Sequence, residues 1–418
     1  MHQTLECSLT GKTYDPDKLQ GLSEAGKPLL ARYDLASLRA SFTPESVRQS
    51  QIRSMWRFHP VLPVDSPQEA VTLGEGMTPL LPVHPVGPFA EFQNLLVKDE
   101  SFNPTQSFKA RGMSAAITRA KALGVDTVAL PSAGNAAGAA AAYAARAGMK
   151  CVIFVPDDTP PANILESHCH AAHVFLVNGL ISDCGKLCRA ACDRFGWFDL
   201  STLKEPFRIE GKKTMGYELA FDLAAHRGEE RLQLPDVIFY PTGGGTGLIG
   251  MWKAFDEMEQ LGWIDSSRPR MVVVQAEGCC PIVKAFEQNQ SEAPLFPDAH
   301  TIASGLRVPV AVGDFIMLDI LRQSQGTALT VTDAELMEGV YQLAQHQGIQ
   351  AAPEGGAIWM ACHRLLEQGW LRSDETVVLF NTGACVKYNH LLTADNLPRL
   401  DRTADDVIDQ VAAALDLG

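Results

Sequence analysis

One lysine of this 418-residue chain stands where an amine could act as a nucleophile. Lys109 lies in residues 103–112 (NPTQSFKARG), and residues 110–123 have helical composition. Thr105 or Ser107 would supply the N-cap of that helix, which puts Lys109 in its first turn. The first turn is the electropositive end of a helix and lowers the pKa of an amine, as a lysine that forms a Schiff base requires. The same position also suits an ordinary solvated lysine, so this segment needs support from elsewhere.

Residues 131–138 (PSAGNAAG) supply part of that support. They follow a predicted strand and open an alanine-rich helix, and ligands bind at the carboxyl ends of strands in open parallel sheets. The free backbone N–H groups of this loop could hold a carboxylate, and Asn135 could donate to a phenolic oxygen. An N-capping loop that binds no ligand is the alternative.

Residues 240–248 (YPTGGGTGL) form a second glycine-containing loop between a predicted strand and a helix. Gly243, Gly244, Gly245 and Gly247 lack side chains, so backbone N–H groups could converge on a phosphate at the helix start. The P-loop lysine is missing, because residues 246–248 (TGL) stand where a P-loop has Gly-Lys-Ser or Gly-Lys-Thr. This disfavours an NTPase. The alternative is a plain glycine-rich turn.

A fourth segment, residues 380–387 (FNTGACVK), ends another predicted strand in a glycine turn. Thr382 could present its hydroxyl to a ring nitrogen, as donor or as acceptor. An amine nucleophile, an anion-binding loop, a phosphate cradle and a ring-nitrogen partner are together the parts that a pyridoxal 5′-phosphate (PLP) site needs. The four segments therefore predict a PLP site.

The elements that must position these segments alternate between β and α signals. Helical composition fills most intervals between short apolar, β-branched runs, notably at 136–147, 182–195 and 249–261. Such alternation indicates right-handed βαβ crossovers and a parallel sheet covered on both faces. We therefore expect an α/β fold. The predicted buried strands are residues 95–97, 127–130, 151–155, 174–177, 237–240, 271–274 and 376–380.

The two ends of the chain give weaker patterns. The first 70 residues are rich in proline and mixed in polarity, so we expect an irregular N-terminal segment that leads into the folded body near 73–80. Residues 405–417 place Val407, Ile408, Val411 and Leu415 on one helical face. This face predicts a docked terminal helix.

Composition excludes several classes of protein. With 35 Lys and Arg against 49 Asp and Glu, the net charge of −14 would repel a phosphate backbone, so we expect no nucleic acid partner. No apolar run approaches the ~18 residues that span a bilayer, and the first residues lack the layout of a signal peptide. Ten cysteines fit no small disulfide scaffold in a chain of this length. We expect a cytoplasmic protein with reduced thiols and no membrane contact.

The four segments, in this order from about residue 73 to 387, resemble those of fold-type II PLP enzymes, and within them of the threonine synthase family. The lysine segment 103–112 is specific for the superfamily, and its Asn-Pro-Thr opening with Gly112-Met113 favours threonine synthases. The resemblance implies two open, twisted, mostly parallel-sheet domains with PLP between them, the larger made of residues 1–112 and 207–418. The smaller, mobile domain would be residues 113–206. It also implies a small amino-acid substrate and a homodimer.

The resemblance further implies roles for individual residues. Lys109 would form the Schiff base and move protons, Asn135 would contact the ring O3′, and Thr382 would face the ring nitrogen. The cofactor phosphate would lie at Gly243, Gly244, Gly245, Thr246 and Gly247. The substrate carboxylate would lie at Ser132, Ala133, Gly134 and Ala136, and Arg208 would hold the phosphate of O-phosphohomoserine.

Some positions depart from the family pattern. Thr202 and Leu203 stand in place of an Asn-Ser pair, a lysine is missing near Asn163, and Glu277 replaces a small residue near the cofactor. Lys204, Lys212 or Lys213 could substitute as a point charge for the phosphate. A serine or threonine dehydratase is the first alternative function, and a β-replacement enzyme like cysteate synthase is another.

Further clusters have structural or functional interpretations. Residues 166–173 (ESHCHAAH) hold the residue types of a metal site, but PLP chemistry needs no metal and we expect none to function here. Cys184, Cys188 and Cys192 share one helical face and are expected to pack rather than to ligate. Glu354 begins a helix and is either a residue of the cofactor cleft or an N-terminal carboxylate favoured by the helix dipole.

Overall fold

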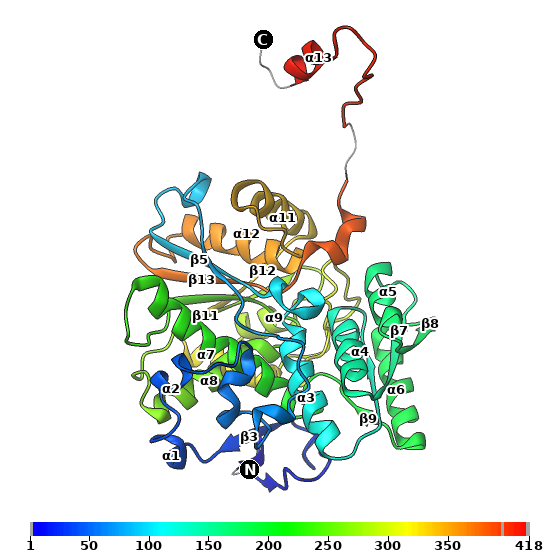
Figure 1. Ribbon diagram of the computed structural model, residues 1–418, viewed down its shortest axis with the longest axis vertical. Coiled ribbons are helices and arrows are strands. Elements are labelled where there is room, and N and C mark those ends of the chain that lie inside the picture. Colours follow the sequence, from blue (N-terminus) through cyan, green and yellow to red (C-terminus); the bar gives the residue numbers. More distant parts are fainter. Residues whose placement is uncertain (1–2, 394–396, 415–418) are drawn as a thin grey trace.

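The computed structural model describes residues 3–393 and 397–414, and its strands form three sheets (Figure 1). A six-stranded sheet has the order β12-β11-β10-β13-β5-β4, in which only β4 is antiparallel to its neighbour. A parallel four-stranded sheet has the order β8-β7-β6-β9. A small antiparallel sheet has the order β2-β1-β3. The strands are β1 (Gln3–Cys7), β2 (Thr13–Tyr14), β3 (Leu29–Tyr33), β4 (Leu80–Pro82), β5 (Asn94–Asp99), β6 (Thr127–Pro131), β7 (Lys150–Pro156), β8 (His173–Val177), β9 (Phe198–Asp199), β10 (Val237–Pro241), β11 (Arg270–Ala276), β12 (Thr327–Val331) and β13 (Thr376–Asn381).

Helices cover both large sheets. Helices α7 to α10 bury their apolar residues against one face of the six-stranded sheet, and α11 and α12 cover the other face. The four-stranded sheet carries α3 and α4 on one face and α6 on the other. The helices are α1 (Leu35–Leu38), α2 (Pro44–Arg48), α3 (Lys109–Ala122), α4 (Asn135–Ala147), α5 (Pro161–Cys169), α6 (Ile181–Phe195), α7 (Phe207–Arg227), α8 (Thr246–Leu261), α9 (Pro281–Glu287), α10 (Asp314–Gln323), α11 (Asp333–Gln347), α12 (Pro353–Glu367) and α13 (Val407–Ala414).

The sequence predictions of the central elements are confirmed. All seven predicted strands form. The helices expected at 110–123, 136–147, 182–195 and 249–261 also form, as α3, α4, α6 and α8, and the fold is α/β with parallel strands predominant. One burial prediction is wrong: β8 is the edge of its sheet, and Phe175 and Leu176 are 52% and 60% exposed. An apolar run alone does not distinguish a central strand from an edge strand.

The predictions for the two ends of the chain need correction. The N-terminal segment is not irregular throughout, because β1 to β3 pair and bury Leu5, Cys7 and Leu29 against Phe207 of α7. The terminal helix forms as α13 but stands apart from the body, and Ile408 is 75% exposed (Figure 1). The docked arrangement is therefore wrong for the described residues, and Leu415 lies outside them.

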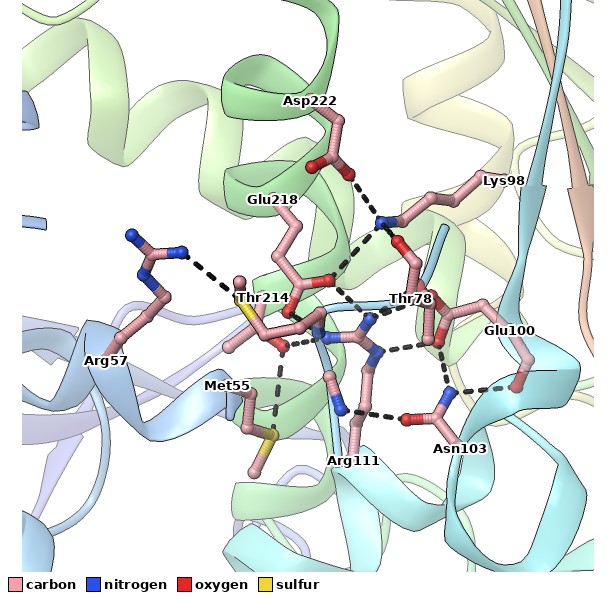
Figure 2. Close-up of polar contacts among 12 residues, drawn as sticks. Met55, Arg57, Thr78, Lys98, Glu100, Asn103, Arg111, Thr214, Glu218 and Asp222 are labelled. Atoms are coloured by element: carbon pink, nitrogen blue, oxygen red, sulfur yellow. Dashed lines mark hydrogen bonds and ion pairs between the residues drawn. The ribbon is translucent and has the colours of Figure 1, made fainter. Parts of the chain in front are cut away.

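A buried ion network fixes the start of α3, where Lys109 lies. Two residues after that lysine, the fully buried Arg111 donates through Nε to Glu100 at 2.6 Å and through Nη2 to Glu218 of α7 at 2.6 Å (Figure 2). Lys98 of β5 joins the network through Glu218 and Asp222. Burial raises the pKa of Glu218, but Arg111 and Lys98 outweigh it and hold that pKa at about 2. The network therefore ties α3 to β5 and α7 through buried ion pairs.

Replacing Arg111 by methionine would leave Glu100 and Glu218 buried without their main cation. Removing one partner of a buried ion pair typically costs about 3–5 kcal/mol. We expect R111M to lower the free energy of unfolding by that amount, measured by urea denaturation. The control is R372M, because Arg372 is exposed and its buried partner Glu375 keeps a second cation, Arg270, so the loss should stay below about 1 kcal/mol. Equal losses in the two variants would contradict a structural role for the network.

Candidate active site

The carboxyl ends of β10 and β13, with the starts of α3, α4, α8 and α12, surround one cavity of about 110 Å³. All eight residues predicted to contact the cofactor line it, although they come from four separate segments of the chain. Eight further residues complete the wall. The lining residues are Phe108, Lys109, Asn135, Thr202, Tyr240, Pro241, Gly243, Gly244, Gly245, Thr246, Gly247, Gly305, Leu306, Val308, Glu354 and Thr382.

Backbone pairing brings Thr382 to the lysine segment. The Phe108 N–H donates to the Thr382 carbonyl at 3.1 Å, and Ser107 and Gly383 form an antiparallel bridge. Gly383 also leaves room for Asn135, whose Nδ2 lies 3.3 Å from the position that a Cβ on Gly383 would occupy. Two segments that are far apart in sequence thus meet at Lys109.

Lys109 is the first residue of α3, as predicted, but the predicted caps are wrong. Phe108 occupies the N-cap position without a side-chain hydrogen bond, and neither Thr105 nor Ser107 caps the helix. Burial and the nearby Arg208 guanidinium lower the pKa of Lys109 to about 7, although the Glu354 carboxylate partly opposes them. The amine lies 4.2 Å from the centroid of the Phe108 ring. An unprotonated amine is therefore abundant near neutral pH, as a nucleophile or a proton acceptor requires.

The glycines of the second loop are required by close packing as well as by an open cavity. A Cβ on Gly247 would lie 1.8 Å from Tyr240 Oη, and a Cβ on Gly245, whose φ is +73°, would lie 2.0 Å from Met317 Sδ. Thr246 begins α8, and the N-cap Gly245 offers no side-chain acceptor. The first N–H groups of a helix have no intrahelical partner, and Gly245, Thr246 and Gly247 line the cavity, so this helix start can bind an anion.

Several polar atoms around the cavity are buried and lack a hydrogen-bond partner in the part of the chain that the structure describes. They include Asn135 Oδ1, Ser107 Oγ and Glu354 Oε2. Such atoms are normally satisfied in a folded protein, so they indicate a ligand or ordered water in the cavity. Glu354 Oε1 in contrast accepts from Gly305 N at 2.8 Å and from Tyr388 Oη at 2.7 Å. Of the two interpretations of Glu354, the structure supports a residue of the cleft.

The loop predicted to receive a carboxylate lies beyond β6 and leads into α4. Of its residues, Asn135 lines the cavity, whereas Ser132, Ala133, Gly134 and Ala136 are not among the lining residues. Gly134 is the N-cap of α4 and has no side chain to accept from the first N–H groups. A Cβ on Gly134 would lie 3.0 Å from Ser304 Oγ, so this loop faces the 303–305 loop across the cavity edge. Two of its N–H groups are already used, since Ser132 donates to the Phe154 carbonyl at 3.1 Å and Gly134 donates to Ser132 Oγ at 3.3 Å. Those of Ala133, Asn135 and Ala136 have no partner among the described residues and fit an anion.

Arg208 lies in the first turn of α7 and is buried. Its Nη1 donates to the Leu200 carbonyl at 2.6 Å, while Nε and Nη2 have no partner among the described residues. Burial lowers its pKa to about 10, although Glu205 and Asp199 oppose this. Arg208 does not line the cavity, but its backbone packs on the start of α3, since a Cβ on Gly112 would lie 2.9 Å from the Arg208 carbonyl oxygen.

The structure separates the lysines that could substitute at a phosphate. Lys213 is neutralised by Glu210 and Glu257, and Lys204 pairs loosely with Asp199 at 3.5 Å near the surface. Lys212, in contrast, contacts Thr246 at the cavity. Reasoning from the sequence did not separate these three. Lys204 precedes α7, and only the phase of that helix decides whether Lys212 or Lys213 points toward the site.

The other positions that depart from the family pattern lie in different surroundings. Thr202 lines the cavity, Leu203 is buried in the core, and Asn163 is buried in α5. Glu277 is exposed and does not line the cavity, so it is not the cofactor neighbour that the sequence suggested. Sequence analysis missed Gly305, Leu306 and Val308 as wall residues, since their segment carries no chemical motif of its own.

The remaining clusters lie away from the cavity. Cys184 and Cys188 are buried, and Cys188 packs against Ala129 and Val152, which confirms the prediction of packing. His170 and His173 are exposed. No described helix combines the length and apolar character needed to cross a bilayer.

Comparison with known proteins agrees with this geometry. Residues 71–383 match the family of pyridoxal-phosphate dependent enzymes. A threonine synthase of Methanocaldococcus jannaschii is 33% identical over 382 residues, which are 91% of this chain and 92% of that protein. A threonine synthase of Methanosarcina acetivorans is 33% identical over 385 residues, with 92% of each chain covered.

A solved structure shares the fold at lower identity. Maize serine racemase superposes with a TM-score of 0.62 at 19% identity, covering 84% of this chain and 98% of that one. The family match over residues 71–383 includes the lysine segment, both glycine-containing loops and Thr382. The chain belongs to the pyridoxal-phosphate dependent enzymes and, within them, to the threonine synthase family.

Proposed function

We propose that this PLP-dependent lyase is a threonine synthase, which converts O-phospho-L-homoserine and water to L-threonine and phosphate. The observation that carries the proposal is the convergence of Lys109, Asn135, the 243–247 loop and Thr382 on one cavity in a chain that matches threonine synthases over nine-tenths of its length. The resident cofactor of the family is PLP, and this cavity fits it. The amine has a pKa near 7, the glycine loop offers N–H donors to a phosphate, and Asn135 lines the cavity with its amide oxygen unpartnered among the described residues.

We assign the contacts as follows. Lys109 would hold the cofactor aldehyde, the N–H groups of the 243–247 loop would hold its phosphate, and Asn135 would donate to its phenolic oxygen. Thr382 would meet the ring nitrogen. When bound, PLP withdraws electrons from the substrate and makes its Cα–H and Cβ–H bonds acidic. A carboxylate would keep the ring nitrogen protonated, but the Thr382 hydroxyl does not, so the ring withdraws electrons less strongly. Proton transfer by Lys109 would therefore contribute more to lowering the activation barrier.

Lys109 is the base in this account. Its amine would take the proton from Cα of the substrate and then assist removal of a proton from Cβ, after which the γ C–O bond breaks and phosphate leaves with the electron pair. Water then adds at Cβ, and Lys109 returns protons to the carbon skeleton. The products are threonine and phosphate, so atoms and charge balance without a further reactant.

Two anion sites would orient the substrate. The N–H groups of the 132–136 loop that have no partner among the described residues, those of Ala133, Asn135 and Ala136, would hold the α-carboxylate at the start of α4. Arg208, whose Nε and Nη2 have no partner in the described part of the chain, would hold the leaving phosphate, and the Thr202 hydroxyl would add a hydrogen bond. We propose that residues 113–206, which carry the four-stranded sheet, move to close on the substrate and exclude water.

We further propose that the enzyme works in the cytoplasm as a homodimer. All ten cysteines are free thiols, which supports a reducing compartment. The family resemblance supports the dimer, and light scattering after size exclusion would measure it.

Removing the amine of Lys109 should abolish catalysis. We expect K109A to lower phosphate and threonine formation from O-phosphohomoserine by more than about 10³-fold, since it removes both the covalent anchor and the base. The measurement follows phosphate, threonine and keto acid on one preparation, with L-serine and L-threonine as comparison substrates. Keto acid from serine or threonine, without phosphate release from O-phosphohomoserine, would make the wild-type protein a dehydratase. Full activity of K109A would contradict the assignment of Lys109 as covalent anchor and base.

Arg208 offers a test of the substrate phosphate site. A charge-assisted hydrogen bond contributes ~1.5–3 kcal/mol, so R208L should lower kcat/KM for O-phosphohomoserine by about 10- to 100-fold. R208L should also lose competitive inhibition by inorganic phosphate, which a purely structural defect would not remove selectively. The matched control is R372L at the surface. Inhibition by phosphate that is unchanged in R208L would place the substrate phosphate elsewhere.

The low pKa of Lys109 sets a pH window. Only the unprotonated amine attacks an aldehyde, so a pKa of about 7 makes the amine reactive at lower pH than an ordinary lysine. With pyridoxal, whose lack of a phosphate avoids a second titration, the rate of borohydride-trapped attachment to cofactor-free protein should rise between roughly pH 6 and 8 and then level off. A rate that keeps rising to about pH 10 would show an unshifted lysine.

A further inference from the structure

Lys212 is a buried lysine whose only direct hydrogen bond in the described chain is to a hydroxyl. It is fully buried, and its Nζ donates to Thr246 Oγ1 at 2.7 Å. Apart from the catalytic candidate Lys109, the other buried lysines of the described chain contact carboxylates: Lys98 meets Glu218 and Asp222, Lys213 and Lys253 meet Glu210 and Glu257, and Lys387 meets Glu166. An ammonium without an anion is costly inside a protein. Lys212 therefore differs from these lysines because no carboxylate of the described chain contacts it.

The surroundings of Lys212 are apolar or cationic. Its Nζ lies 5.1 Å from the centroid of the Phe108 ring, and a Cβ on Gly112 would lie 2.9 Å from its Cε. Burial and the charges of Arg208 and Lys109 lower the pKa of Lys212 well below the usual range, and Glu205 opposes them only in part. This combination makes the position unfavourable for a cation unless an anion binds nearby.

Thr246 connects Lys212 to the cavity. It begins the 16-residue helix α8 and lines the cavity within the glycine loop. Because its oxygen accepts from Lys212, the hydroxyl proton of Thr246 is directed away from the amine and is available to a ligand. The free N–H groups of the same helix start lie beside it. A phosphate at this place would meet a hydroxyl donor, a helix N-terminus and a cation behind them.

We infer that Lys212 is a positioning residue for the cofactor phosphate: it holds the Thr246 hydroxyl as a donor to a phosphate oxygen and supplies positive charge behind the glycine loop. The inference rests on the proposed placement of that phosphate at residues 243–247. It assigns the cofactor phosphate rather than the substrate phosphate, because Lys212 contacts the cavity through α8, whereas Arg208 has free donors of its own. Lys212 thus acts through Thr246 and not on the reacting carbons.

The test compares PLP with pyridoxal, which lacks only the phosphate. Dissociation constants of both are measured by absorbance titration of the cofactor-free full chain, for wild type, K212M, K212Q, T246V, T246S and the double variant K212M/T246V. A charge-assisted hydrogen bond corresponds to a factor of about 10 to 100. We expect K212M and T246V each to weaken PLP binding by that factor and to change pyridoxal binding less than about twofold. T246S should bind PLP nearly as wild type does.

The double variant tests whether Lys212 acts through Thr246. It should lose little more PLP affinity than either single variant, because the two side chains form one unit. Full additivity would overturn the coupling. K212Q keeps a donor but no charge, so intermediate PLP affinity supports the inference and remains measurable if K212M does not fold.

Three results would overturn the inference. In the first, PLP and pyridoxal affinities fall together in K212M and K212Q, which would make the role of Lys212 structural. In the second, T246V loses affinity for PLP but K212M and K212Q keep it, so the loop holds the phosphate without Lys212. In the third, PLP affinity is kept while KM for O-phosphohomoserine rises, so Lys212 serves the substrate phosphate. Since the readout uses no substrate, failure of the threonine synthase activity would leave a positive result intact.

Discussion

The site depends on three cationic side chains, Lys109, Arg208 and Lys212, gathered where burial disfavours their charge. Each has a lowered pKa, and in each the first cause is burial. Elsewhere in the described chain, buried cations such as Arg111 and Lys98 are matched by carboxylates and keep a raised pKa. The structural network thus needs no ligand, because its charges are paired. At the site, the charged forms of the three side chains become favourable when anions bind.

The two groups of charges lie on the same elements. Arg111 follows Lys109 by two residues on α3, and Glu218 lies on the same helix as Arg208 and Lys212. Close packing of glycines brings these helices together: a Cβ on Gly211 would lie 1.9 Å from the Arg111 carbonyl oxygen. The neutralised network thus holds α3 and α7 in contact, and this contact places the unneutralised amines beside the cavity. The paired ion network thus fixes the position of the side chains whose pKa is lowered.

Much of the site could be predicted from the sequence because its parts are local. Lys109 at a helix start, the glycine loop after β10 and Thr382 after β13 each follow from a strand, a turn and a helix in succession. Their convergence follows from the rule that parallel strands end at one edge of a sheet. The central strands were predictable for the same reason, since each is a short apolar run flanked by helices.

The remainder required the fold. Whether Lys212 or Lys213 faces the cavity depends on the phase of α7, and the cleft position of Glu354 depends on its contacts with Gly305 and Tyr388. Phe175 and Leu176 read as core residues, yet β8 is an edge. The apolar face of α13 predicted docking, but amphipathic pattern does not specify a partner surface.

The reaction in water labelled with heavy oxygen tests the central claim most directly. If phosphate leaves by cleavage of the γ C–O bond and water then adds at Cβ, mass spectrometry will find the label in the threonine hydroxyl and none in the released phosphate. Labelled phosphate with homoserine would show simple ester hydrolysis, and unlabelled substrate with no phosphate released would show that O-phosphohomoserine is not the substrate. Either of these two results would contradict the account.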